Sequence, residues 1–181
     1  MTDLQFESCI RLMIDKDRNG LKDIYTAYAK QIYRVILGIV RSHEDAEDLT
    51  SDFFLKLWNM ADSYKSGQGH KRWLTVIARN LALDHLRKQH PEQLDIDSED
   101  GPAANIAAEG SLENSVSAKL TLEAALSQLS LAERQIVEMK LGMELTFREI
   151  ARTLGEPQGT VAWRYDRAVS KLKKIMEEEQ L

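Results

Sequence analysis

Apolar residues recur every three or four positions along most of this chain, the spacing that places them on one face of an α-helix. No alternation of apolar and polar residues and no Asn-Gly hairpin sequence predicts a β-strand. The sequence therefore predicts an all-α protein. The predicted helices cover residues 4–16, 21–40, 44–60, 71–89, 120–129, 131–141, 146–154 and 158–178.

The helical pattern is interrupted over residues 91–117. This stretch contains two prolines and two glycines, and every charged residue in it is acidic. Such a composition is typical of a flexible linker whose like charges repel one another. The expected organisation is two small helical domains, residues 1–90 and 118–181, joined by a flexible acidic linker over residues 91–117.

The C-terminal quarter has the pattern of a helix-turn-helix. Thr146 and Glu149 are spaced as a capping box at the start of a short helix. Gly155 suits the end of that helix, and Pro157 suits the first turn of the next. A basic helix behind a tight turn is what insertion into the major groove of DNA requires. Its expected inward stripe consists of Val161, Tyr165, Ala168 and Leu172.

The charge of the chain is unevenly distributed. The net charge of −5 argues against a nucleic-acid-binding protein, because attraction to phosphate dominates non-specific binding. However, residues 65–88 and 148–174 are both basic, and they flank the acidic linker. This distribution predicts two DNA-facing modules that bind DNA poorly until a partner arranges them.

Composition also limits where the protein is expected to work. A hydrophobic fraction of 43% supports packed cores, and a charged fraction of 29% supports a soluble surface. The apolar run over residues 35–40 is too short to span a bilayer, and no secretory signal precedes it. Cys9 is the single cysteine, so no internal disulfide is possible. We therefore expect a cytoplasmic protein.

Residues 44–58 predict an amphipathic helix with acidic side chains outside its apolar stripe. Three interpretations fit it. The acids can simply face water near the positive end of the helix dipole, or they can bind a basic helix of a partner. A dinuclear carboxylate metal site is the third, but the helix lacks the Glu-x-x-His pairing of such sites.

Residues 63–88 begin with a loop that contains Gly67 and Gly69 and continue into a basic helix. Aromatic and basic side chains in this arrangement can stack on unpaired bases and track a single strand. Alternatively, Trp73 can be a core residue that anchors the start of the helix. His70 and His85 show no metal-ligand spacing with Cys9. We expect no metal, no cofactor and no catalytic residue.

Three segments together resemble the bacterial RNA polymerase sigma factors of the extracytoplasmic-function (ECF) class. DAEDLTSDFFLKLW resembles the helix that binds core polymerase, and WLTVIARNLALDHLR resembles the helix that recognises and melts the minus-ten element. The third segment, LSLAERQIVEMKLGMELTFREIARTLGEPQGTVAWRYDRA, resembles the domain that binds the minus-thirty-five element. The resemblance implies a promoter-specificity subunit that is not itself an enzyme. A stand-alone helix-turn-helix regulator, acting as a dimer without polymerase, is the alternative.

The resemblance also implies partners and site residues. The partners are core RNA polymerase, through the clamp helices and the flap, promoter DNA and an anti-sigma factor. The positions that match the core-binding residues of the family are Asp48, Ser51, Asp52, Phe54 and Trp58. The positions that match its minus-ten region are Tyr64, Lys65, His70, Lys71, Arg72, Trp73, Arg79, Asn80, Asp84 and Arg87. Those of the helix-turn-helix are Thr146, Gln158, Thr160, Ala162, Trp163, Arg164, Asp166, Arg167 and Lys171.

The chain departs from the usual family pattern at five of these positions. Ser51 and Asp52 stand where the family usually has Gln and Glu, so the contacts with polymerase are expected to be looser or bridged by water. His70 stands where the family often has Phe. Ala162 and Trp163 replace the usual basic residue and Ser, so the promoter sequence cannot be inferred from family averages.

Overall fold

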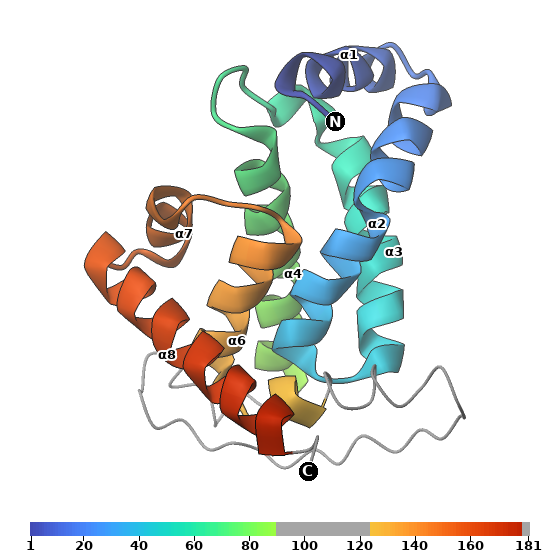
Figure 1. The fold of residues 1–181 in the computed structure, drawn as a ribbon. Helices are drawn as coiled ribbons and strands as arrows, with labels where there is room; N and C mark the ends of the chain where they lie inside the picture. The colour runs from blue at the N-terminus through green and yellow to red at the C-terminus, as the bar shows by residue number, and fades with distance from the viewer. Residues whose placement is uncertain (90–123, 179–181) are drawn as a thin grey trace.

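The computed structural model describes residues 1–89 and 124–178, which are almost entirely helical (Figure 1). No residue in these two ranges belongs to a strand, and the predicted all-α class is confirmed. The predicted linker and the start of the helix predicted over 120–129 lie outside the described residues. The N-terminal elements are α1 (Asp3–Ile14), α2 (Arg18–Val40), α3 (His43–Asn59), the 3-10 turn η1 (Ala61–Ser63) and α4 (His70–Gln89). The C-terminal elements are α6 (Leu131–Val137), the π-helical turn η2 (Glu138–Gly142), α7 (Phe147–Leu154) and α8 (Gln158–Glu178).

Local capping explains where several helices begin and end. Thr146 forms the predicted capping box with Glu149, and Ser130 forms a second one with Glu133. Ser42 caps α3 by accepting a hydrogen bond from the amide of Asp45 at 3.2 Å. A further capping box at Thr2 starts α1. Gly155 ends α7 in the left-handed region at φ 74°, which a glycine adopts without strain.

The N-terminal domain is built around α2, which packs against α1, α3 and α4 (Figure 1). Gly20 makes the sharp return from α1 to α2 possible, because a Cβ atom there would lie 2.3 Å from the carbonyl oxygen of Cys9. The helices of this domain enclose an apolar core. The largest fully buried side chains in it are Phe6, Met13, Ile24, Ile32, Ile36, Phe53, Leu57 and Leu74.

The C-terminal domain packs α8 across α6 and α7. Val161 and Ala168 are buried and Tyr165 and Leu172 are partly buried, which confirms the predicted inward stripe of α8. The segment α6–η2 also lies beside α2, and α7 contacts α4 (Figure 1). Ile136, Met139, Met143 and Leu145 consequently belong to the same buried cluster as the core of the N-terminal domain.

None of the helices in the described ranges is both long enough and apolar enough to cross a lipid bilayer.

Candidate protein and nucleic-acid interfaces

The outer face of α3 is acidic. Asp48, Ser51 and Asp52 are exposed, while Phe53 and Leu57 of the same helix are buried in the core. The apolar stripe thus fixes which side of the helix faces water. In the described ranges, no three His, Cys, Asp or Glu side chains come close enough together to hold a metal ion. Exposed carboxylates on one face of a helix can face water or bind a basic macromolecular partner.

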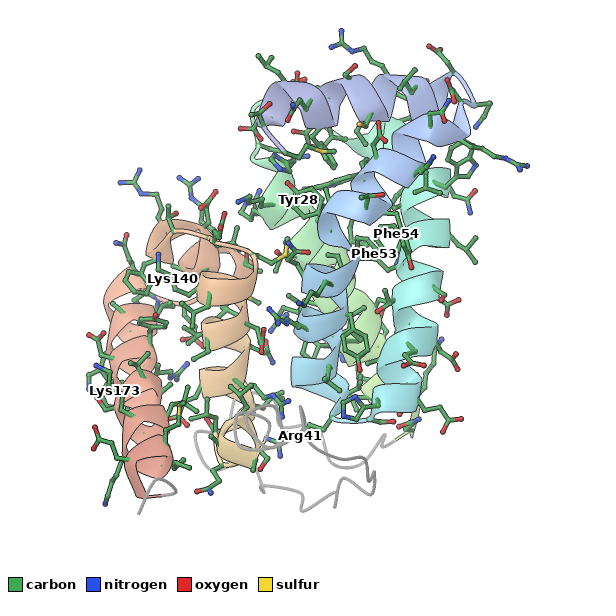
Figure 2. The ribbon with its side chains drawn as sticks, turned by 45° about the vertical axis from the view of Figure 1, so that its right-hand side comes forward. Tyr28, Arg41, Phe53, Phe54, Lys140 and Lys173 are labelled. Atoms are coloured by element: carbon green, nitrogen blue, oxygen red, sulfur yellow. The ribbon has the colours of Figure 1, made fainter. Side chains whose placement is uncertain are left out.

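Phe54 differs from its predicted role as a contact residue. Its side chain is only 5% exposed and packs on Tyr25, with ring centroids 4.8 Å apart. Figure 2 shows Phe54 and Phe53 together among the helices of the N-terminal domain. We therefore reassign Phe54 to the core. The apolar side chains that are exposed on this part of the surface are Tyr25 and Leu55, at 54% and 63%.

Aromatic residues form a packed cluster where α1 meets the start of α4. The rings of Tyr64 and Trp73 lie 5.0 Å apart, and the ring of Phe6 lies 5.1 Å from Tyr64 and 6.2 Å from Trp73. Burial raises the pKa of the Tyr64 hydroxyl. Tyr64 and Trp73 are partly buried, so a core contribution of Trp73 is seen directly.

His70 lies inside this cluster and not on the surface. It is 4% exposed and its ring stacks on Phe6. Its Nδ1 contacts the carboxylate of Asp3, which can only accept, so Nδ1 donates. In the neutral ring, Nε2 then accepts from the Tyr28 hydroxyl at 2.5 Å. The predicted contact of His70 with DNA is therefore replaced by an internal link between α1, α2 and α4.

The pKa values of the two titratable partners of His70, Asp3 and Tyr28, are both shifted. The hydrogen bond from His70 is the largest influence on Asp3 and lowers the pKa of that carboxyl. Burial raises the pKa of Tyr28 to about 12, with a smaller contribution from the charge of Asp3. Both groups thus keep their ordinary protonation states near neutral pH.

The polar residues that are predicted to contact the minus-ten element divide into two groups. Lys71 forms an ion pair with Glu144, and Arg79 donates from Nε to Oε1 of Gln135 at 3.0 Å. Both partners belong to the C-terminal domain. Arg72 is partly buried as well. The residues that remain exposed among those predicted to contact the minus-ten element are Lys65, Asn80, Asp84 and Arg87.

The recognition helix α8 exposes four of its eight predicted contact residues. Gln158, Trp163, Asp166 and Arg167 are exposed, as is Thr146 at the start of α7. Thr160, Ala162 and Lys171 are half-buried. Figure 2 shows the later residue Lys173 on the side of α8 that faces away from the N-terminal helices.

Arg164 has a structural partner that the sequence analysis did not identify. Its Nη1 donates to both carboxylate oxygens of Glu156, at 2.6 and 2.5 Å, and its side chain is 16% exposed. Glu156 lies in the turn between α7 and α8. The pair ties the recognition helix to its own turn, so Arg164 is less accessible to DNA than we expected.

Glu133 is a second unforeseen partner of α8. Its side chain is 4% exposed and accepts from Lys171 at 2.8 and 2.9 Å, while the Nε of Arg167 lies 3.4 Å from Oε1. Burial alone would raise the pKa of Glu133, but the hydrogen bonds from Lys171 and from the Ser130 amide lower it. The carboxylate therefore stays ionised beneath the basic side chains of α8.

Comparison with known proteins places two family models on the chain. Sigma-70 region 2 matches residues 24–92, and Sigma-70, region 4 matches residues 125–174. The ECF RNA polymerase sigma factor SigW of Bacillus subtilis is 28% identical over 167 residues, which is 87% of this chain and 89% of that protein. SigX, another ECF sigma factor of the same bacterium, is 23% identical over 159 residues, which is 85% and 82% of the two chains.

Solved structures share the fold. The sigma factor RpoE of Bartonella quintana, solved in complex with the anti-sigma factor NepR, superimposes with a TM-score of 0.68. The two are 24% identical, and the match covers 86% of this chain and 96% of RpoE. CnrH, solved in complex with the cytosolic domain of CnrY, also gives a TM-score of 0.68 at 15% identity, with 96% and 98% of the two chains covered.

Proposed function

Because the chain belongs to the ECF class of RNA polymerase sigma factors, we propose that α3 docks on core polymerase while α4 and α8 hold promoter DNA. The protein directs core RNA polymerase to specific promoters and promotes melting of the DNA for transcription initiation. The polymerising chemistry belongs to the core enzyme, and the chain works in the cytoplasm, where that enzyme acts.

One observation carries this proposal: an exposed acidic helix face and an exposed helix-turn-helix occur in the same chain. A stand-alone regulator would need only the helix-turn-helix, and it would not account for the match of residues 24–92 to Sigma-70 region 2. On α3, Asp48 and Asp52 would meet the basic clamp helices of the largest polymerase subunit. Complementary charges of this kind favour fast and correctly oriented association.

On the DNA side, α8 would enter the major groove at the upstream element. Ala162 can contact a thymine methyl group but cannot donate a hydrogen bond to guanine, whereas Arg167 can do so. At the downstream element, the exposed residues Lys65, Asn80 and Arg87 would track the displaced single strand through charge and hydrogen bonds.

An anti-sigma factor is the natural regulator of such a protein. The structures of RpoE with NepR and of CnrH with CnrY support this part of the proposal, because they contain chains of the same fold bound to a partner.

Run-off transcription with purified core polymerase and a library of promoters tests the function. The chain should confer initiation at a defined set of start sites that core polymerase alone does not use. Asp48→Arg should weaken core binding by roughly tenfold or more, because it places like charges together at the interface. Glu177→Arg, which makes the same charge change on an exposed residue of α8, is the control.

Two results would contradict the proposal. One is that no promoter responds to the chain in the presence of core polymerase. The other is that the chain alone binds symmetric half-sites tightly, as a dimeric regulator would.

A further inference from the structure

Trp163 and Arg167 lie one turn apart on the exposed face of α8. The Trp163 side chain is 55% exposed, although an indole of that size is usually at least half covered in a folded domain. The Cζ atom of Arg167 lies 5.4 Å from the centroid of the indole ring, within the range of a cation–π contact. The exposed face of the Trp163 ring thus contacts the Arg167 guanidinium.

A second contact comes from a different helix. The Nε of Arg167 lies 3.4 Å from Oε1 of Glu133 on α6. That carboxylate is itself fixed by Lys171 and by the Ser130 amide, and its pKa is lowered, so it is charged near neutral pH. Arg167 is consequently restrained by a ring of α8 and by a buried anion of α6.

We propose that Trp163 and Glu133 are positioning residues that orient Arg167 for one defined contact with the upstream promoter element. The inference rests on the function proposed above. Glu133 engages Nε, which leaves the two terminal nitrogens of the guanidinium for an acceptor on DNA. A planar guanidinium binds the O6 and N7 atoms of guanine through a pair of hydrogen bonds, so its orientation decides whether it reads a base. Restraint in the free protein lowers the entropic cost of that contact.

A double-mutant cycle on promoter variants tests the inference. The variants are Trp163→Ala, Trp163→Phe, Arg167→Ala and the double alanine variant, each assayed as the full chain with core polymerase on promoters substituted at every upstream position. Arg167→Ala should relax selection at one position by roughly tenfold, the scale of a bidentate base contact. Trp163→Ala should relax the same position by about two- to fivefold, the scale of an exposed cation–π contact.

The double alanine variant should be no worse than Arg167→Ala, and Trp163→Phe should restore most of the selection because its ring can still receive the guanidinium. Met176→Ala, which truncates another exposed apolar side chain of α8, should leave selection unchanged. Additive losses, a different relaxed position for Trp163→Ala, or no effect of Trp163→Ala would each overturn the inference. Failure of the wild-type chain to initiate at any promoter would instead overturn the proposed function.

Discussion

The helices α4 and α8 both carry basic side chains that we propose to meet DNA, but their cations are restrained differently. On α4, Lys71 and Arg79 contact Glu144 and Gln135 of the other domain. On α8, Lys171 and Arg167 contact Glu133 of their own domain. A restraint within one domain moves with the helix and can orient a side chain on DNA. A restraint between domains must be broken before the side chain can reach DNA.

The α6–η2 segment has a double role. Glu133 faces α8 and is held ionised by its partners, whereas Glu138 packs against Gly38 of α2 and has its pKa raised by burial. One segment thus supports the recognition helix and closes over the N-terminal domain. Substitutions in the two regions should therefore differ in the size and the sign of their effects.

Truncation of the cores should show how unequally the two helices depend on packing. Leu74→Ala on α4 should lower the free energy of unfolding by about 2–5 kcal/mol, because the side chain is fully buried and leaves a cavity. Leu172→Ala on α8, which is only partly buried, should cost about 1 kcal/mol. Urea unfolding followed by circular dichroism measures both. Equal losses would show that α8 is as deeply anchored as α4.

Glu133→Gln should destabilise the C-terminal domain by about 1–2 kcal/mol at pH 7, the lower part of the range for hydrogen bonds to charged groups, because Lys171 is 38% exposed. The pKa of Glu133 is lowered on folding, so its contribution is present above the ordinary value of 4.5 and is lost as pH falls through the folded pKa. The difference between wild type and variant should therefore shrink below pH 4.5 in urea titrations. A difference that stays constant with pH would exclude the ionised carboxylate as its source.

Tyr28→Phe should cost about 1 kcal/mol, because it removes the hydroxyl that bonds to buried His70 and leaves Nε2 unpaired. The change acts at the start of α4 and should leave binding of the upstream element unaffected. Thermal unfolding and upstream-element binding by the full chain are the two measurements. Tyr25→Phe, which alters an exposed tyrosine of α2, the helix that also carries Tyr28, is the control.

Glu138→Gln should have the smallest effect on the free energy of unfolding, and it should stabilise the protein where the other substitutions destabilise it. Burial raises the pKa of Glu138, while the charges of Arg134 and Arg34 partly offset it. A raised carboxyl pKa means that the ionised form costs stability as pH rises above the ordinary value of 4.5. The glutamine variant should be slightly more stable than wild type at pH 7 and equal to it below pH 4.5. A variant less stable at pH 7 would show that the two arginines outweigh burial.

The sequence predicted the helices well because their signals are local. The capping box at Thr146 and the stop at Gly155 act within three or four residues, and each is present in the structure. The fold class and the inward stripe of α8 follow from the same short-range periodicity. The exposed acidic face of α3 follows from it as well. The burial of Phe54 does not, because an aromatic residue beside the apolar stripe can be buried by a neighbouring helix.

The partners of the site residues could not be predicted in this way. His70 and Asp3 are 67 residues apart, Lys71 and Glu144 are 73 apart, and Arg79 and Gln135 are 56 apart. No periodic pattern connects positions at such separations. A family comparison did not supply them either, because His70 and Trp163 are departures from the usual residues at their positions.

The exposure of Trp163 has an optical consequence. Of the three tryptophans, Trp58 and Trp73 are partly buried against the core, whereas Trp163 is 55% exposed on the recognition helix. Its emission should be the most red-shifted of the three, and a base or a phosphate that approaches Arg167 must change it. With Trp58 and Trp73 replaced by phenylalanine, the chain would report promoter engagement through its own fluorescence, without an attached dye.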